Sequence, residues 1–140
     1  MTTRRENILS YVMTAMSNDV TGVEGIYRSR VEALRREETP AVLLEFMQDN
    51  ADYSTLDQMD WTLQFRVSVI TRGDGPDTLA DPIVSLIHDT LMADRTLGGL
   101  AFDILPVSTQ FRPADGDQPI GVTECIFSVR YRTLASTMEV

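Results

Sequence analysis

In two segments of the chain every second residue is apolar. In residues 60–70 the apolar positions are Trp61, Leu63, Phe65, Val67 and Val69. In residues 123–133 they are Cys125, Phe127, Val129 and Tyr131. Because a β-strand sends alternate side chains to opposite faces, each segment predicts a strand with one face in a core. The second face is mixed and weakly polar, and it carries Arg66, Arg130 and Arg132.

Apolar residues recur at helical spacing near the start of the chain. A helix over residues 4–17 places apolar residues on one side: Ile8, Val12, and Ala15 or Met16. Thr3 and Glu6 have the spacing of a capping box, which begins a helix. We therefore expect the first helix to begin directly after Thr3.

A second helix is predicted over about residues 77–94, again with one apolar side: Leu79, Ile83, Leu86 or Ile87, and Leu91. Pro82 would damage a helix interior. We therefore expect it either in the first turn, behind Asp81 as the N-cap, or in a short turn before the main helix. Gly98 or Gly99 would supply the left-handed residue that ends the helix.

The remaining segments are shorter or more polar. Short strands are predicted around residues 26–28 and 41–46, and residues 100–111 predict a strand interrupted at Pro106. Residues 48–58 and 112–121 are polar and rich in turn-forming residues, and we interpret both as loops, with room for a little extended structure in the first.

The order of elements is helix, two short strands, one long strand, helix and two strands. Because strands and helices do not alternate regularly, this order favours the α+β class. We expect a mostly antiparallel β-sheet with two main helices packed on one face. A single domain is predicted over residues 1–140. Whether residues 136–140 are ordered or disordered is left open.

Composition restricts the function. The net charge is −9, so phosphate repels most of the surface, and nucleic-acid binding is disfavoured unless the arginines gather in one patch. No stretch approaches the roughly 20 apolar residues that span a bilayer, and we expect a soluble protein made in the cytosol. The single Cys125 excludes an intrachain disulfide and is interpreted as a buried, inert thiol.

The residue types that carry catalysis are sparse. The only histidine, His88, is interpreted as a partly buried structural residue of the second helix. The sequence has no G-x-S-x-G motif, and one Cys with one His cannot form a clustered metal site. We therefore predict no enzymatic activity and no cofactor.

Acidic residues gather in two turn-rich places, and oxygen ligands of this kind can hold a hard cation. Asp74, Asp77 and Asp81 surround one glycine-rich turn, and Asp115 and Asp117 flank Gly116. Neither group has the register of an EF-hand, and we interpret both as solvated carboxylates. No metal site is predicted.

The mixed face of the two long strands is the remaining candidate for function. A solvent-facing sheet surface is one interpretation, because antiparallel sheets often have one. A protein interface is the other, since interfaces favour arginine over acidic residues. The face carries one acid, Glu124, in a chain rich in acids, and this favours a contact surface.

Residues 79–101 read LADPIVSLIHDTLMADRTLGGLA, and residues 129–133 read VRYRT. In the order of these and the other segments, residues 4–134 resemble the tail terminator, or tail completion, proteins of long-tailed bacteriophages and prophages, a class of minor tail protein. The resemblance implies an α+β subunit that assembles into a ring, usually a hexamer, on the end of a finished tail tube.

The resemblance also implies a place and partners in the virion. The ring would stop tube polymerisation at the head-proximal end of the tail and offer the surface for head–tail joining. Its partners would be further copies of the chain, the tail tube protein, and a head connector or head completion protein. DNA would pass through the ring without specific binding, which a negative charge favours.

Ring closure requires two different patches on each subunit. We expect Arg66, Arg130 and Arg132 to supply one patch. An acidic stretch over residues 49–60 is expected to supply part of the other: Asp49, Asp52, Asp57 and Asp60. The two polar loops are candidates for contact with the tube or connector, the second through Asp115, Asp117 and Gln118.

Two other functions remain open at this point. Another head–tail joining or head completion protein would also be a small α+β domain that forms a ring. A small-ligand-binding or enzymatic α+β domain is the alternative from a different class, and a monomer with a deep polar pocket would favour it.

Overall fold

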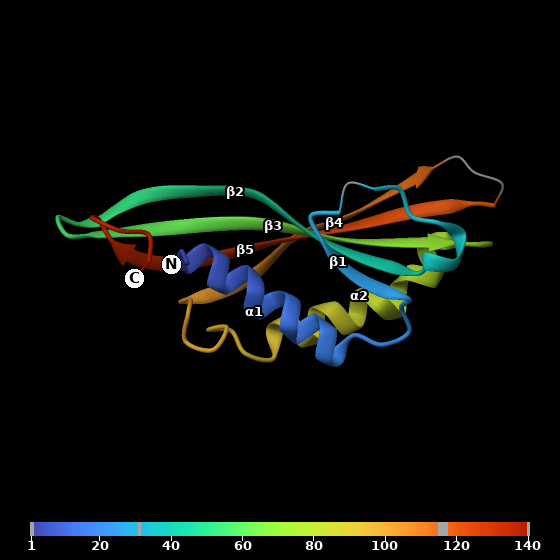
Figure 1. Cartoon of the computed structure of the whole chain (residues 1–140), viewed down its shortest axis with the longest axis horizontal. Coiled ribbons are helices and arrows are strands. Elements are labelled where there is room, and N and C mark those ends of the chain that lie inside the picture. The colour runs from blue at the N-terminus through green and yellow to red at the C-terminus, as the bar shows by residue number, and fades with distance from the viewer. Residues whose placement is uncertain (1, 31, 115–117, 140) are drawn as a thin grey trace.

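The structure of the chain, a computed structural model, describes residues 2–30, 32–114 and 118–139. Its helices are α1 (Arg4–Asp19), α2 (Pro76–Met92) and the short 3-10 helix η1 (Arg36–Glu38). Its strands are β1 (Gly25–Arg28), β2 (Ala41–Thr55), β3 (Gln58–Arg72), β4 (Asp103–Ala114) and β5 (Ile120–Leu134). They form one sheet in the order β1-β2-β3-β5-β4, in which β1 and β2 are parallel and the other neighbours are antiparallel (Figure 1). The α+β prediction is confirmed.

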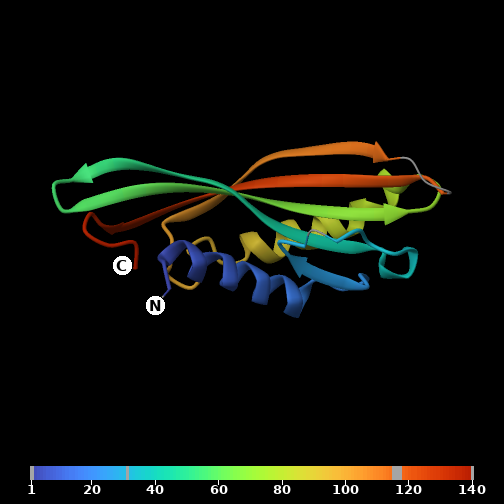
Figure 2. The same ribbon diagram turned by 45° about the horizontal axis from the view of Figure 1, so that its top comes forward.

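Both main helices cover the same face of the sheet (Figure 2). On that face Phe65 of β3 lies opposite Phe127 of β5, and their rings stack with centroids 5.6 Å apart. The helices add buried residues to the same core: Ile8, Leu9, Val12, Met16, Ala80, Ile83, Ile87 and Leu91. Because burying each large apolar side chain contributes roughly 1.5–3 kcal/mol, this layer holds the helices against the sheet.

The first helix begins as predicted. The Thr3 hydroxyl oxygen accepts a hydrogen bond from the Glu6 N–H at 3.1 Å, which caps α1. After the helix ends, the short strand β1 lies where the sequence predicted it.

Residues 48–58 form a hairpin, so the prediction of a loop there is wrong. β2 and β3 stay paired from Ala41↔Ile70 to Thr55↔Gln58, with a register shift between Phe46 and Gln48. The turn end of this hairpin projects beyond both helices (Figures 1 and 2). Because no helix covers it, its side chains need not alternate between apolar and polar, and the strand pattern is hidden.

The prediction that residues 112–121 form a loop is also wrong at its ends. Residues 112–114 continue β4, and residues 120–121 begin β5. β4 also runs through Pro106, with a register shift between Pro106 and Ser108. A proline lacks the N–H that a central strand needs, but β4 is an edge strand, where a missing donor is tolerated.

Pro82 lies inside α2, so both predicted positions for it are wrong. The helix begins earlier, with Gly75 as the N-cap at φ 63° and Pro76 in its first turn. Pro82 and Thr78 are both exposed, so water can hydrogen-bond to the Thr78 carbonyl that proline leaves without an N–H partner. The helix ends at Met92, and Gly98 and Gly99 adopt positive φ in the turn that follows instead of capping it.

Candidate assembly surface

The face of the sheet opposite the helices is the surface that the strand pattern singled out. Arg66 lies opposite Ile126, and Arg130 lies opposite Thr62, so these residues share that face. We call it the outer face. β2 and β4 contribute Glu45 and Asp103 to it, and the end of β3 contributes Asp60. The expectation that it carries a single acid is therefore wrong, because it left out β2 and β4 and did not count Asp60 at the start of the 60–70 segment.

Arg66 is paired within the subunit. Its guanidinium lies 3.1 Å from Glu45 and 3.0 Å from Glu124. Arg112 lies 2.6 Å from Glu124, whose side chain is only 9% exposed. The charges in this part of the outer face are balanced by one another, and Arg66 acts mainly as a cross-strand tie.

Arg132 is also paired, although its side chain is 39% exposed. Its Nε donates to Asp60 at 2.7 Å across the β3–β5 pair, and its guanidinium lies 4.9 Å from the centroid of the Phe102 ring. The hydrogen bond from Arg132 lowers the pKa of the Asp60 carboxyl. The predicted basic and acidic patches therefore lie side by side at this point instead of apart.

Arg130 differs from the other two arginines. Its side chain is exposed, and no carboxylate of the described residues forms an ion pair with it. Asp103, opposite Arg130 in the strand pairing, instead pairs with Arg95 at 2.7 Å. Arg130 is therefore the predicted arginine whose charge is available to another molecule.

Asp49 lies on the helix side of the sheet, away from the other predicted acids. Its side chain is 2% exposed, accepts a hydrogen bond from the Tyr131 hydroxyl and lies 3.8 Å from Arg5. Burial raises the pKa of the Asp49 carboxyl above its ordinary value. Asp52 and Asp57 are exposed near the end of the hairpin, so these two remain accessible for a contact.

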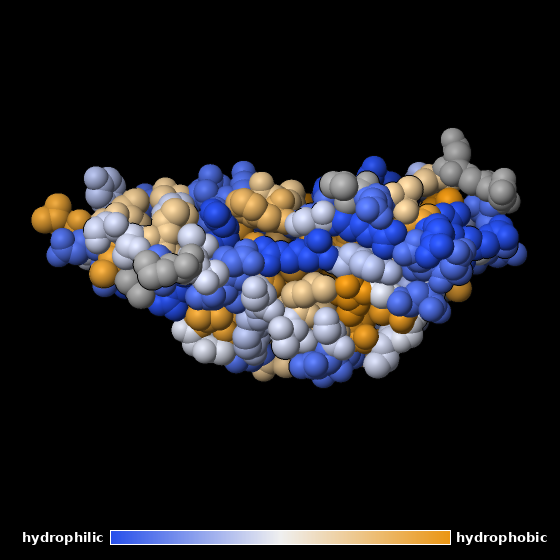
Figure 3. Space-filling model, viewed as in Figure 1, coloured by the Kyte–Doolittle hydropathy of each residue, from blue (hydrophilic) through white to orange (hydrophobic). Residues whose placement is uncertain are grey.

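The end of the β2–β3 hairpin carries apolar side chains that pattern analysis missed. Tyr53 is 80% exposed and Leu56 is 88% exposed. Figure 3 shows apolar atoms at this end of the molecule. An isolated apolar residue in a polar run gives no periodic signal, but two of them at the end of a projecting hairpin suggest a contact point.

The remaining predicted positions differ in exposure. Gln118 is exposed, while Asp115 and Asp117 lie outside the described residues. Asp74, Asp77 and Asp81 are exposed at the start of α2, and within the described ranges no group of three His, Cys, Asp or Glu residues could hold a metal ion.

Cys125 is buried as predicted, and burial raises its thiol pKa. His88 is exposed, not partly buried, because the core side of α2 is formed by Ala80, Ile83, Ile87 and Leu91.

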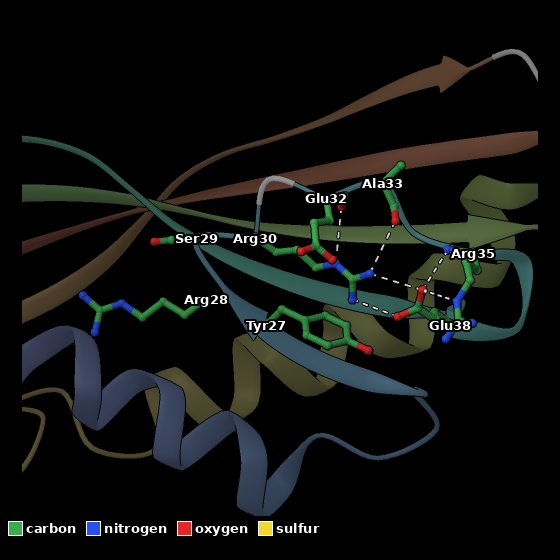
Figure 4. Close-up of a pocket in the computed structure, with 8 residues that line it drawn as sticks. All are labelled: Tyr27, Arg28, Ser29, Arg30, Glu32, Ala33, Arg35 and Glu38. Atoms are coloured by element: carbon green, nitrogen blue, oxygen red, sulfur yellow. Dashed lines mark hydrogen bonds and ion pairs between the residues drawn. The ribbon is translucent and has the colours of Figure 1, made fainter.

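A hollow of about 660 Å³ lies between β1 and the segment that leads to η1 (Figure 4). Its charged side chains are paired with one another: Arg30 lies 2.8 Å from Glu38, and Arg35 lies 3.2 Å from the same carboxylate. The Arg30 guanidinium also stacks 4.5 Å from the Tyr27 ring centroid. These contacts hold Arg30 and residues 32–39 in place, and they leave Arg30 and Arg35 paired without a ligand.

In the part of the chain that the structure describes, no helix is long and apolar enough to cross a membrane.

The fold and surface can be compared with known proteins. A scan against models of protein families finds no match, and neither does a search of the curated proteins. Among solved structures, the chain is similar to a chain of the "Virion of native gene transfer agent (GTA) particle", with a TM-score of 0.64 and 15% sequence identity. The similarity covers 89% of this chain and 94% of that chain, so the two share one fold over nearly their whole lengths.

Proposed function

We propose that the chain is a structural virion protein that forms a ring on the end of a phage tail tube. The ring ends tail polymerisation and provides the surface to which the head joins. The observation that carries this proposal is the shared fold, over nearly the whole of both chains, with a component of a gene transfer agent virion. The resemblance of residues 79–101 and 129–133 to tail terminators supports the more specific role.

A closed ring, a hexamer in this proposal, needs two unlike contact surfaces on each subunit. The two edges of the sheet differ in the required way. β1 pairs only with Ala41–Leu44, which leaves the rest of β2 open on that side among the described strands. β4 forms the other edge, and Pro106 and Pro113 remove N–H groups from it.

The β2–β3 turn lies at one end of the molecule, and the end of β4 and the start of β5 lie at the other (Figure 1). The β2–β3 turn presents Tyr53 and Leu56, and the β4–β5 turn presents Gln118. A joint between tube and head needs two binding ends, so in this proposal one turn contacts the tail tube and the other contacts the head connector. The net charge of −9 weakens binding to phosphate, and DNA passes through the ring without specific binding.

The position of the protein in a particle tests this function. A copy with a peptide tag after residue 139, labelled with gold on purified particles, should appear once per tail at the junction with the head. Label along the tube would indicate a tube subunit, and label at the tail tip would also contradict the proposal. Label on tailless heads would instead identify a head completion protein.

A further inference from the structure

We propose that an apolar groove beside α2 receives the Phe102–Leu105–Arg130 surface of a second copy of the chain. This inference rests on the proposed ring and names the two surfaces that close it. The occupant is a copy of the same chain because the two surfaces match in apolar character, in charge and in position on the subunit.

The groove has a volume of about 310 Å³ and opens beside the first turns of α2. Its apolar lining includes Pro40, Leu79, Pro82, Ile83 and Leu86, and Leu79 is 45% exposed. An exposed apolar hollow of this kind is large enough for one or two side chains of a partner.

The charge beside the groove is negative. Asp77 and Asp81 are exposed and line a neighbouring hollow that shares Pro82 with the groove, and within the described residues no arginine forms an ion pair with either carboxylate. Arg72 is the one cation that lines the groove; its Nη2 donates to the Leu34 carbonyl at 3.3 Å, and its single positive charge is outnumbered by the Asp77 and Asp81 carboxylates. The apolar lining of the groove therefore suits an apolar side chain, and the carboxylates beside it suit a neighbouring cation that has no partner of its own.

The β4 edge of the sheet provides such a surface. Phe102 is 48% exposed and Leu105 is 46% exposed. Arg130 is adjacent to both, because the Phe102 N–H donates to its carbonyl and Leu105 pairs with Ser128, two residues earlier on β5. Arg130 is exposed and lacks a carboxylate partner among the described residues, so it can reach the Asp77 and Asp81 carboxylates of another copy.

The two surfaces lie on different sides of the subunit. Thr21, Gly22 and Pro40, which line the groove, lie just before β1 and β2, at one edge of the sheet. Phe102 and Leu105 belong to β4 and the residue before it, at the other edge. A contact between unlike surfaces repeats from copy to copy, so it does not stop at a dimer, and it closes a ring when the rotation between neighbouring copies closes.

Charge reversal on each side tests the contact. Arg130→Glu and Asp81→Arg should each weaken self-association at least about tenfold, because a like-charge pair replaces an attraction. An equimolar mixture of the two variants should recover the native mass, since each native surface finds a native partner and each reversed surface finds a reversed one. Light scattering after size-exclusion chromatography measures the mass.

Two matched controls separate this contact from the overall charge. Arg36→Glu and Asp89→Arg change exposed residues elsewhere, the latter on α2 itself, and both should keep the native mass. Native mass in both Arg130→Glu and Asp81→Arg overturns the inference, and so does a mixture that stays dissociated. A native chain that remains a monomer at its highest soluble concentration overturns it too.

A cross-linking experiment gives a second reading. In a Cys125→Ser background, Leu105→Cys combined with Leu79→Cys should produce a ladder of linked species with a short bismaleimide. Leu105→Cys alone should give no ladder. A ladder absent from the double variant, with both thiols shown to be reactive, contradicts the contact. None of these outcomes depends on where the ring sits in a particle, so the inference can fail while gold labelling still supports the proposed function.

Discussion

Asp49 joins three parts of the subunit at one buried carboxylate. It extends from β2, accepts a hydrogen bond from Tyr131 of β5 and lies 3.8 Å from Arg5 of α1. Burial is the largest influence on the Asp49 pKa and raises it, while the hydrogen bond from Tyr131 and the charge of Arg5 act in the opposite direction. The two partners offset part of the cost of a buried charge.

Removing the Tyr131 hydroxyl should destabilise the fold. In Tyr131→Phe the Asp49 carboxylate loses a buried donor, and we expect the free energy of unfolding to fall by about 1–3 kcal/mol. Urea unfolding followed by circular dichroism measures the change. Tyr53→Phe is the matched control, because Tyr53 is 80% exposed, and it should stay within about 0.5 kcal/mol of the native value. Equal stability of both variants would contradict this role for Tyr131.

The raised pKa of Asp49 also predicts a pH dependence. The folded chain holds the proton on Asp49 more tightly than the unfolded chain, so this group lowers stability as pH rises above 3.8 through the folded pKa. The side-chain amide that Asp49→Asn introduces does not titrate. The stability of this variant relative to the native chain should therefore increase across that window and then become constant. A difference that falls with increasing pH would contradict the direction of the shift.

The faces of individual residues could be predicted from alternation, but their partners could not. Arg66, Arg130 and Arg132 do share the outer face. The pairing of Arg132 with Asp60, however, joins residues 72 positions apart and depends on the register of β3 against β5. A strand pattern does not determine its neighbour's register, so the sequence could not show which arginine remains available.

At the scale of elements, residues 32–39 are held mainly by polar contacts. Glu38 accepts from Arg30 and Arg35, and Arg72 of β3 donates to the Leu34 carbonyl. Hydrogen bonds from Arg30 and from the Arg35 backbone lower the pKa of Glu38 to about 2. This support is present above pH 4.5 and is lost as pH falls from there toward about 2.

The variant Glu38→Gln should loosen this segment without unfolding the domain. We expect faster amide hydrogen exchange in residues 32–39 at neutral pH, with unchanged exchange in β3 and β5. Glu37→Gln is the control, because the Glu37 side chain is 68% exposed and has only a 3.5 Å contact with Arg35. Equal exchange in the two variants would show that Glu38 does not hold the segment.

The projecting hairpin should matter for assembly more than for folding. Leu56→Ser changes a side chain that is 88% exposed, so unfolding should shift by no more than about 0.5 kcal/mol. If the hairpin end contacts the tube or connector, the variant should be recovered from particles in lower amounts than the native protein. Undiminished incorporation, measured by mass spectrometry of purified particles, would exclude Leu56 from that contact.

The elements that could be predicted are those whose faces are covered. β3, β5 and α1 bury one side, so their period is visible in the sequence. The far half of β2 and most of β4 are exposed, and backbone pairing, which leaves little trace in side-chain pattern, determines them. Pro82 shows that a local rule can also mislead. The rule that proline disrupts a helix interior failed here, because Pro82 lies on the exposed side of α2.

At the scale of the whole molecule, the order of elements was enough for the fold class, because strands that do not alternate with helices rarely form a parallel sheet. The candidate contact beside α2 could not be predicted from the sequence, because the groove combines residues from Thr21 to Leu86 that only the fold brings together. The subunit that results has unlike edges and unlike ends, which is the asymmetry that a ring between tube and head requires.

The length of tails made without this protein tests the central claim most directly. The gene would be deleted from the phage or prophage that carries it, and tail lengths would be measured by negative-stain electron microscopy. We predict headless tails of irregular length that exceed the native length, with native length restored by a plasmid copy. Finished tails of native length that fail to join heads would contradict a terminator and favour a head completion protein.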